Sequence, residues 1–336
     1  MPKNRFWQLD AHPQGQDFAS ALSLREEDMP PLEDGQVRIT AQWLSMDAGT
    51  RMWMGPRTDG YQPPLPLGGK MVGLVLGTVC ESRVAAYPVG ALVRGFGQWA
   101  DYSVVTPALT GLDIVDTGVA DPREHFGALG MNAWTALVGV RDVACIQPGE
   151  WIAVSAAAGA TGSMACQVAR NLGARVVGIA GGPAKCRYLI DELGVDIAID
   201  YKADDIAARL ANEVPGGLNA YFDNVGGPIL DAVLPNMALY GRVAVCGLVA
   251  AYDNDAPLPG PARYDQVLMR RLRIEGFFIP DYFDRSAEFL PPLRTWLDEG
   301  RLATRFDETP GLENVLTAYA RMLSGGAIGK VIVKVA

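Results

Sequence analysis

The chain has 336 residues, of which 49% are apolar and 20% are charged, and its formal net charge is −9. This length suggests two domains, and the composition is that of a soluble globular protein. The acidic balance argues against nucleic acid or an anionic membrane as the main partner, because both attract basic surfaces. A small ligand is not excluded, since its site can be locally basic.

Neither a targeting signal nor a disulfide framework is expected. The first residues, MPKNRFWQLDAHPQGQDF, lack the apolar core of a secretory signal. Residues 151–169 carry no charge, but they are mostly Ala, Gly, Ser and Thr, so they predict a buried strand, a turn and a helix rather than a membrane span. The five cysteines are scattered and form no Cys-x-x-Cys pair, which indicates reduced thiols in a cytoplasmic protein.

Residues 1–126 have the pattern of a mostly β domain. Short β-like runs are separated by Gly and Pro, which is typical of strands joined by tight turns. These runs span residues 36–46, 73–82, 91–97 and 99–105.

Residues 127–300 alternate strands with helices instead. Pro183 opens one of these helices, which is expected to run to about Leu193. The alternation predicts an α/β domain with a doubly wound parallel sheet. Its strands are expected at residues 151–155, 174–181, 196–200, 220–225, 242–247 and 273–279.

Residues 301–336 have the pattern of a helix followed by a strand. Leu312, Val315, Tyr319 and Leu323 fall on one helical face, and residues 330–335 alternate as in a strand. We expect this last strand to return to the first domain, so that the α/β domain is inserted into the β domain.

A glycine-rich turn follows the first strand of the α/β domain, in the stretch VSAAAGATGS (residues 154–163). Such a turn lets a pyrophosphate approach the N-terminus of the next helix, where free N–H groups and the helix dipole favour an anion. Ala157 occupies the place of the usual first glycine, which predicts a slightly relaxed turn. The residues expected at the pyrophosphate are Gly159, Ala160, Thr161 and Gly162.

The end of the second strand favours NADP over NAD. NAD is usually held there by an Asp or Glu that binds the ribose 2′-hydroxyl, but residues 176–187 contain no acid. Gly181 and Gly182 leave space, and Lys185 follows them. Because a 2′-phosphate is repelled by a carboxylate and attracted by an ammonium group, we predict NADP(H) as the cofactor. The alternative for Lys185 is an ordinary solvated surface lysine.

Together these features resemble a known family. Motifs such as WLSMD (residues 43–47), GMNAWTALVGV (130–140), YFDNVGG (221–227) and GKVIVKV (329–335) are similar, in the family's order, to those of zinc-independent medium-chain dehydrogenases/reductases of the prostaglandin reductase, leukotriene B4 12-hydroxydehydrogenase and curcumin reductase group. The resemblance covers nearly the whole chain. It implies a GroES-like first domain, a Rossmann-type second domain and a homodimer.

The same resemblance implies roles for individual residues. Lys185 and Tyr201 would hold the 2′-phosphate, Asn224 would lie by the ribose, and Thr135 would contact the cofactor. The nicotinamide would be flanked by Cys246, Gly247 and Tyr252 from one segment and by Phe277, Phe278 and Ile279 from another.

Two positions depart from the family pattern. Gly49 stands where the family commonly has a tyrosine, although Arg51 of the same motif remains, and Ala327 stands where it often has an asparagine. The first change is expected to open the substrate pocket, and the second removes a polar contact to the cofactor.

A zinc site is not expected. A catalytic zinc needs Cys, His and an acid as ligands, but the chain has two histidines, His12 and His125, and neither has a Cys or Glu at ligand spacing. Gly69 and Lys70 stand where zinc-dependent relatives would have His and Glu.

Without zinc, the chemistry favoured is reduction of a carbon–carbon double bond conjugated to a carbonyl. The β-carbon of such an enone or enal accepts hydride from NADPH, and hydrogen-bond donors at the carbonyl oxygen stabilise the enolate. Tyr252 is the candidate donor of the proton to the α-carbon, since it follows a strand at the carboxyl edge of the sheet. The alternative is that Tyr252 only shapes the pocket and that water is the acid.

The expected function is therefore NADPH-dependent reduction of small apolar α,β-unsaturated ketones or aldehydes. Two rivals stay open. One is an NADPH:quinone oxidoreductase of the same superfamily, and the other is a protein that binds NADP without catalysis.

Overall fold

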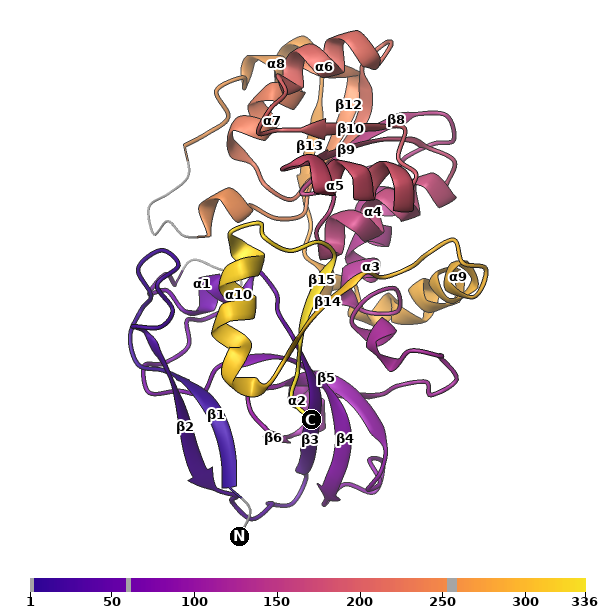
Figure 1. Cartoon of the computed structure of the whole chain (residues 1–336). Helices are drawn as coiled ribbons and strands as arrows, with labels where there is room; N and C mark the ends of the chain where they lie inside the picture. The colour runs from indigo at the N-terminus through magenta and orange to yellow at the C-terminus, as the bar shows by residue number, and fades with distance from the viewer. Residues whose placement is uncertain (1–2, 59–61, 253–258) are drawn as a thin grey trace. The chain divides into compact units, whose positions relative to one another are not determined.

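The structure is a computed structural model of the chain and describes residues 3–58, 62–252 and 259–336. Within these residues the chain divides into two compact units (Figure 1). The first contains the described residues up to Phe126, Tyr252 and the segment Phe306–Ala336. The second contains Gly127–Ala251 and the described residues 259–305. Each unit has its own sheet and its own apolar core.

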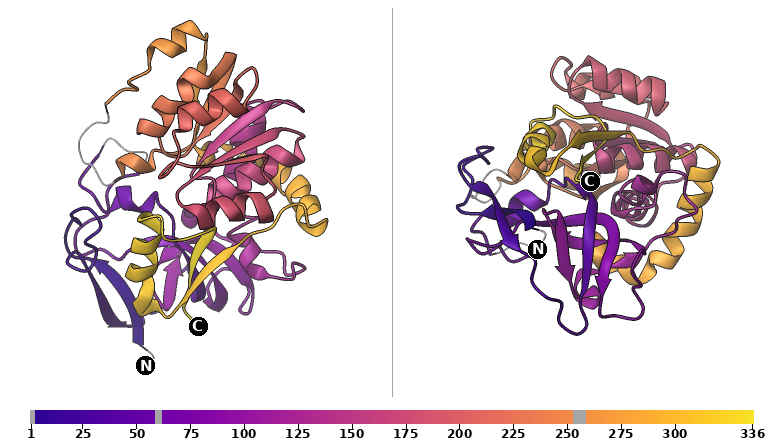
Figure 2. Two further views of the ribbon diagram at one scale, coloured as in Figure 1. Left: turned by 45° about the horizontal axis from the view of Figure 1, so that its top comes forward. Right: turned by 60° about the horizontal axis from the view of Figure 1, so that its bottom comes forward.

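A six-stranded sheet forms the centre of the second unit, coloured magenta to orange in Figure 2. Every neighbouring pair is parallel, and the order is β10-β9-β8-β11-β12-β13. The chain therefore builds outward from β8 on one side and then crosses to β11 on the other, which confirms the predicted doubly wound fold. The strands are β8 (Trp151–Ser155), β9 (Arg175–Ala180), β10 (Ile197–Asp200), β11 (Leu218–Asp223), β12 (Met237–Val245) and β13 (Arg273–Gly276).

Helices cover both faces of this sheet because successive strand residues point to opposite sides. Trp151 and Ala153 of β8 pack in one apolar core with Leu210 and Val233, while α4 contacts β8 and β9. The helical elements are α3 (Met131–Leu137), η2 (Val138–Val143), α4 (Ala160–Asn171), α5 (Pro183–Arg187), η3 (Tyr188–Glu192), α6 (Ile206–Glu213), α7 (Gly227–Val233), η4 (Leu234–Asn236), η5 (Val249–Ala251), α8 (Asp265–Met269), η6 (Ile279–Arg285) and α9 (Ser286–Asp298).

The first unit is built on a mainly antiparallel seven-stranded sheet of order β14-β15-β3-β4-β5-β7, with β6 paired to β3. The last strand, β15, pairs with β3. Tyr319 lies in the core of this unit, edge-on to Trp99 with ring centroids 5.3 Å apart. The elements are β1 (Lys3–Leu9), β2 (Leu22–Asp28), β3 (Val37–Ser45), α1 (Thr50–Trp53), β4 (Val72–Ser82), β5 (Leu92–Gln98), β6 (Tyr102–Val105), α2 (Pro107–Thr110), β7 (Asp113–Ile114), η1 (Pro122–His125), β14 (Phe306–Pro310), η7 (Leu312–Asn314), α10 (Val315–Leu323) and β15 (Lys330–Lys334).

Three local features differ from the sequence expectations. β13 ends at Gly276, and Ile279, expected as its last residue, instead begins the 3₁₀ turn η6, in which Pro280 occupies a favoured early position. The helix opened by Pro183 changes to π geometry at Tyr188. Residues 301–305 belong to the second unit, since Gln167 of α4 hydrogen-bonds with Ala303 in both directions. Across the described residues, no helix is long and apolar enough to cross a membrane.

Candidate cofactor site

The glycine turn, Gly159–Gly162, joins β8 to α4. Its last residue, Gly162, is packed so closely that no side chain fits there. A Cβ atom on Gly162 would lie 2.2 Å from the carbonyl oxygen of Ala156. Ala156, just before the turn, takes a left-handed conformation with φ of +47°, which is unusual for a residue with a Cβ. The tight turn therefore forms without a glycine in the first position. The slight relaxation expected from Ala157 stays a prediction.

The first turn of α4 offers an anion-binding end. Its first N–H groups have no partner within the helix, no side chain caps them, and the first turn carries no acid. Thr161 is positioned by Asn132 of α3, whose side-chain amide donates to the Thr161 hydroxyl at 2.9 Å. Ala160 and Thr161 thus start a fixed twelve-residue helix whose dipole favours negative charge here.

Two lysines stand at the ends of the neighbouring strands. Lys185 lies on α5, just after β9, and Lys202 follows β10. Neither forms an ion pair within the described chain, although the carboxylate of Asp200 is close enough to feel the charge of Lys202. Burial and the charge of Lys202 lower the pKa of Lys185 from its ordinary value. Lys185 is half-buried and is repelled by the charge of Lys202, so an anion bound beside the two lysines would stabilise their charged forms.

Tyr201 packs against the double glycine after β9. A Cβ on Gly181 would lie 2.7 Å from the Tyr201 ring, so glycine is required for this contact. Asp200 also reaches the turn, because its carboxylate accepts from the backbone N–H of Gly182 at 2.8 Å. That hydrogen bond, followed by the one from the Lys202 N–H, lowers the pKa of Asp200. We call Lys185, Tyr201 and Lys202 the basic corner.

Lys202 was not predicted as a site residue. It is exposed and follows Tyr201 directly, so in the sequence it looks like any solvated lysine. The signal available was its place after the third expected strand, one strand along from Lys185.

Asp223 organises the carboxyl ends of the central strands. Its side chain is fully buried, and its Oδ1 accepts from the hydroxyls of Ser155 and Tyr221, at 3.2 and 2.8 Å, and from the N–H groups of Val225 and Gly226. Its Oδ2 has no hydrogen-bond partner in the described part of the chain. Burial, with the nearby Asp223 charge second, raises the pKa of Tyr221. Asp223 was not predicted, because its role depends on β8 and β11 being neighbours.

Asn224 is held beside Ser155 at this same edge. Its backbone N–H donates to the Ser155 hydroxyl at 2.9 Å, and its side-chain amide donates to the Ser155 carbonyl at 2.7 Å. The second bond fixes the orientation of the side chain. Asn224 is therefore a rigid part of the edge at which the predicted ribose site lies.

Cys246 and Gly247 follow β12 and are tied to the same strand end. Both donate their backbone N–H to the Asp223 carbonyl, at 2.8 and 3.1 Å. The residue Cys246 is only partly shielded from solvent, but burial of the thiol and the Asp223 charge raise its pKa to about 12. At neutral pH the thiol is protonated and is not a nucleophile.

The aromatic segment after β13 packs on the sheet edge. Phe277 meets Phe222 edge-on, with centroids 6.2 Å apart, and Gly139 of η2 leaves room for both rings, since a Cβ there would lie 2.4 Å from Phe222. Phe278 is half-buried and Ile279 is buried.

The remaining predicted residues, Thr135 and Tyr252, are on other elements than the strand ends described above. Thr135 lies on α3, and its hydroxyl donates to the Met131 carbonyl at 2.7 Å. Tyr252 groups with the first unit rather than with the strand edge of the second. In the first unit, Gly49 precedes α1 and Ala327 is part of the apolar core.

The donor atoms needed for zinc are not assembled. His12 shares a hydrogen bond with the Met54 carbonyl at 2.8 Å, and His125 shares one with the Asp116 carbonyl at 2.9 Å. Lys70 forms an ion pair with Glu27. No group of three or more His, Cys, Asp or Glu side chains in the described chain could hold a metal ion, so the residues present do not fit a zinc site.

Two family profiles match the chain. One, described as the N-terminal domain of oxidoreductase, covers residues 5–112, and the other, described as zinc-binding dehydrogenase, covers residues 160–294. The match of the second profile concerns the fold of the second unit, since the described residues do not assemble a donor set for zinc.

Full-length relatives make the assignment narrower. The chain is 37% identical to an NADPH-dependent curcumin reductase of Escherichia coli, over 99% of this chain and 97% of the relative. It is 34% identical to prostaglandin reductase 1 of Mus musculus, over 99% and 100%. It resembles the crystal structure of CurA in complex with NADPH from Vibrio vulnificus with a TM-score of 0.92 at 33% identity, covering 99% of both chains. With its GroES-like first unit and Rossmann-type second unit, the chain belongs to the prostaglandin reductase and curcumin reductase family of medium-chain dehydrogenases/reductases, which are NADP-dependent oxidoreductases.

Proposed function

We propose that the protein reduces the conjugated carbon–carbon double bond of small apolar enones and enals with NADPH. The observation that carries this proposal is the presence of two lysines, Lys185 and Lys202, at the ends of β9 and β10, the next two strands along the sheet from the one that leads into the glycine turn. A basic corner is what a dinucleotide with an additional 2′-phosphate requires. The substrate class is supported by relatives that are named as reductases of curcumin, of prostaglandins and of 2-alkenals.

In this proposal, different residues of the second unit bind different parts of the cofactor. Gly159–Gly162 receive the pyrophosphate, because Gly159 leaves room for close approach, Gly162 lets the turn close, and α4 presents free N–H groups. Lys185, Tyr201 and Lys202 hold the 2′-phosphate. Asn224 orients the ribose. Thr135, Cys246, Gly247, Phe277, Phe278 and Ile279 contact the nicotinamide half.

The bound cofactor supplies a hydride, and the chain supplies position and a proton. The protonated Cys246 thiol, with its pKa of about 12, does not add to an electrophilic enone, so the site tolerates this substrate class. Tyr252 is the proposed donor of the proton to the α-carbon, with water as the alternative. The variant Tyr252→Phe tests this: a fall of about 10²-fold in kcat supports the donor role, and unchanged turnover assigns the proton to water.

Product analysis separates the proposal from its rivals. An assay with NADPH and NADH against enones, enals and quinones should give saturated ketones or aldehydes and prefer NADPH. Formation of hydroquinone alone would instead favour a quinone oxidoreductase. NADPH binding without consumption of any acceptor would favour a non-catalytic NADP-binding protein.

We also propose a homodimer that forms along β13. All four residues of this edge strand are exposed, so its unpaired backbone groups are available to a strand of another chain. Exposed apolar side chains surround it, and such a cluster usually marks an interface. These side chains are Leu239, Tyr240, Leu268, Met269 and Ile274. Sedimentation of the wild type and of Ile274→Lys tests the assignment, since the variant should shift to the monomer.

We also propose a cytoplasmic location. It is supported by the five cysteines, none of which forms a disulfide.

A further inference from the structure

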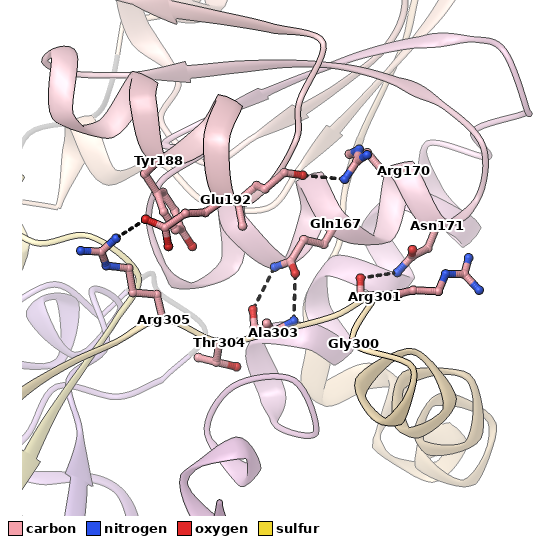
Figure 3. A pocket seen from close by; sticks show the side chains of 11 residues that line it. Gln167, Arg170, Asn171, Tyr188, Glu192, Gly300, Arg301, Ala303, Thr304 and Arg305 are labelled. Carbon is pink, nitrogen blue, oxygen red and sulfur yellow. Dashed lines mark hydrogen bonds and ion pairs between the residues drawn. The ribbon is translucent and has the colours of Figure 1, made fainter.

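The second unit contains a pocket that the cofactor site does not use. It has a volume of about 680 Å³ and lies between the carboxyl half of α4, the π-helical turn η3 and the segment Gly300–Arg305 (Figure 3). This volume is in the range of sites for small organic ligands. Its polar walls come from three segments that are far apart in the sequence.

The pocket is separate from the glycine turn. Gly162 lies at the amino end of α4 and Arg170 near the carboxyl end. The eight positions between them correspond to about 12 Å along a helix. A nucleotide pyrophosphate at the glycine turn would therefore leave this pocket open.

The walls are fixed by hydrogen bonds that do not fill the pocket. Gln167 bonds to Ala303 in both directions, at 3.0 and 2.9 Å. Arg170 donates to the Leu193 carbonyl at 2.7 Å, and Asn171 donates to the Arg301 carbonyl at 3.0 Å. These bonds join all three segments, so the pocket is preorganised rather than a gap between mobile loops.

Positive charge and N–H donors are in excess around the pocket. Arg170, Arg301 and Arg305 line it, and Glu192 is the one carboxylate among the lining residues. Glu192 accepts one hydrogen bond from Arg305 at 2.6 Å. Arg301 is already paired with Glu299 at 3.0 Å, whereas Arg170 donates to the Leu193 carbonyl and has no carboxylate partner in the described chain. Since each guanidinium carries five N–H donors, Arg170 and Arg305 keep donors for a ligand. Such a hollow is notable in a chain with a net charge of −9.

Tyr188 supplies a buried donor at the same place. The residue is 3% exposed and lines the pocket, and its ring lies under the Arg305 guanidinium, 5.4 Å from the centroid. Its hydroxyl meets no hydrogen-bond partner of ordinary geometry in the described chain, although the Ser163 hydroxyl, which donates to the Ala160 carbonyl, is close enough to oppose part of the effect of burial on the Tyr188 pKa. Burial raises the pKa of Tyr188 to about 12, so the hydroxyl keeps its proton. A buried hydroxyl of this kind calls for an acceptor.

We propose that this pocket binds a small organic anion that presents carboxylate or phosphate oxygens. Arg170 and Arg305 pair with the anion, and Tyr188 donates to one of its oxygens. The apolar Tyr188 ring and the volume of the pocket accommodate a carbon skeleton, so the ligand is larger than an inorganic ion.

The test uses the whole protein saturated with NADP⁺, so that the glycine turn and the basic corner are occupied. Calorimetric titration with citrate in one arm and glycerol 2-phosphate in the other distinguishes an organic carboxylate from an organic phosphate. Arg305→Gln removes one charge, and Tyr188→Phe keeps the ring but removes the hydroxyl. Arg294→Gln is the matched control, because Arg294 lies on α9, where it pairs with Asp298.

We expect at least one of the two anions to bind and to raise the unfolding temperature, since it binds the folded state only. Arg305→Gln should weaken that binding about ten-fold or more, and Tyr188→Phe should weaken it about three- to ten-fold. Arg294→Gln should leave it unchanged. The proposal is overturned if neither anion binds at millimolar concentration, or if Arg294→Gln weakens binding as much as Arg305→Gln does.

Discussion

The glycine turn and the basic corner lie on successive units of one sheet, yet they are built in opposite ways. The turn is made of backbone with no spare space, since a Cβ on Gly162 would lie 2.2 Å from the Ala156 carbonyl oxygen. The basic corner is made of side chains that have space and lack carboxylate partners, with Lys185 half-buried and Lys202 exposed.

This difference means that dinucleotide affinity and the choice between NAD and NADP depend on different parts of the site. The pyrophosphate is common to NAD and NADP, so the turn decides whether any dinucleotide binds. The 2′-phosphate belongs to NADP alone, so the corner decides which dinucleotide binds. Substitutions in the turn should therefore alter folding and both affinities, whereas substitutions in the corner should alter one affinity.

Gly162→Ala should have the largest effect. The three closest atoms to its new Cβ are backbone atoms of Ala156 and Ala157, which cannot swing aside. We expect a loss of about 3 kcal/mol in the free energy of unfolding, and equal loss of NADPH and NADH binding. Chemical unfolding and fluorescence titration measure the two quantities.

Gly159→Ala is the control for that variant. Its Cβ would meet only the Ala156 carbonyl oxygen, at 3.3 Å, so we expect a change in stability of less than about 1 kcal/mol. If Gly159→Ala destabilises the fold as much as Gly162→Ala does, the steric argument for position 162 is wrong.

How much of this site was predictable depends on the range of the interactions. β8 was predicted with its observed bounds, and the turn and Lys185 follow it at fixed spacing, so local pattern was enough. Asp223 was missed because its bonds to Ser155 span 68 residues and exist only once β8 and β11 are paired. Lys202 was missed for the same reason, since its closeness to Lys185 requires the pairing of β9 with β10.

The fold shows the same division. Regular alternation predicted the six parallel strands, but not the β1–β2 hairpin, whose first strand mixes charged and aromatic residues. The π geometry at Tyr188 was also not foreseen, because periodicity alone does not distinguish α from π turns over five residues.

Lys185→Ala should have the next largest effect, and on one cofactor only. Loss of a charge-assisted contact to the 2′-phosphate should weaken NADPH binding about 10- to 100-fold, while NADH binding and stability stay near wild type. Titration of both cofactors gives the ratio. An equal loss for NADPH and NADH would remove Lys185 from the phosphate site, and Lys202→Ala in the same assay measures the contribution of the second lysine.

The preference for NADPH should also decline with rising pH earlier than an ordinary lysine would allow. Burial and Lys202 lower the pKa of Lys185, so the ammonium loses its proton at a lower pH than in the unfolded chain. Because the pKa of Lys185 is lower in the folded than in the unfolded protein, its ammonium form reduces the free energy of unfolding at pH values below the folded pKa. This loss of stability disappears as the pH rises through the folded pKa and Lys185 becomes neutral. A bound phosphate reverses the shift, so NADPH binding takes up protons near that pKa.

The ratio of NADPH to NADH affinity, measured from neutral to alkaline pH, tests this expectation. Lys185→Arg is the control, since a guanidinium stays charged over the whole range. The ratio should fall in the wild type and stay constant in this variant. A parallel decline in both proteins would assign the titration to another group.

Gly181→Ala should have the smallest effect, and it tests whether the corner depends on packing as well as charge. A Cβ at position 181 would lie 2.7 to 2.9 Å from two ring carbons and the hydroxyl oxygen of Tyr201. Tyr201 is 45% exposed and can swing away, so stability should change by less than about 0.5 kcal/mol. NADPH affinity should fall only a few-fold, because Lys185 and Lys202 stay in place.

A double-mutant cycle identifies the cause of that small fall. If Gly181 acts by leaving room for Tyr201, then Gly181→Ala should have no further effect in a Tyr201→Ala background, and the coupling should equal the single effect. If the two effects add, the methyl group instead blocks the phosphate directly. The first result would mean that the basic corner, although built of side chains, also depends on a backbone position without a Cβ, as the glycine turn does.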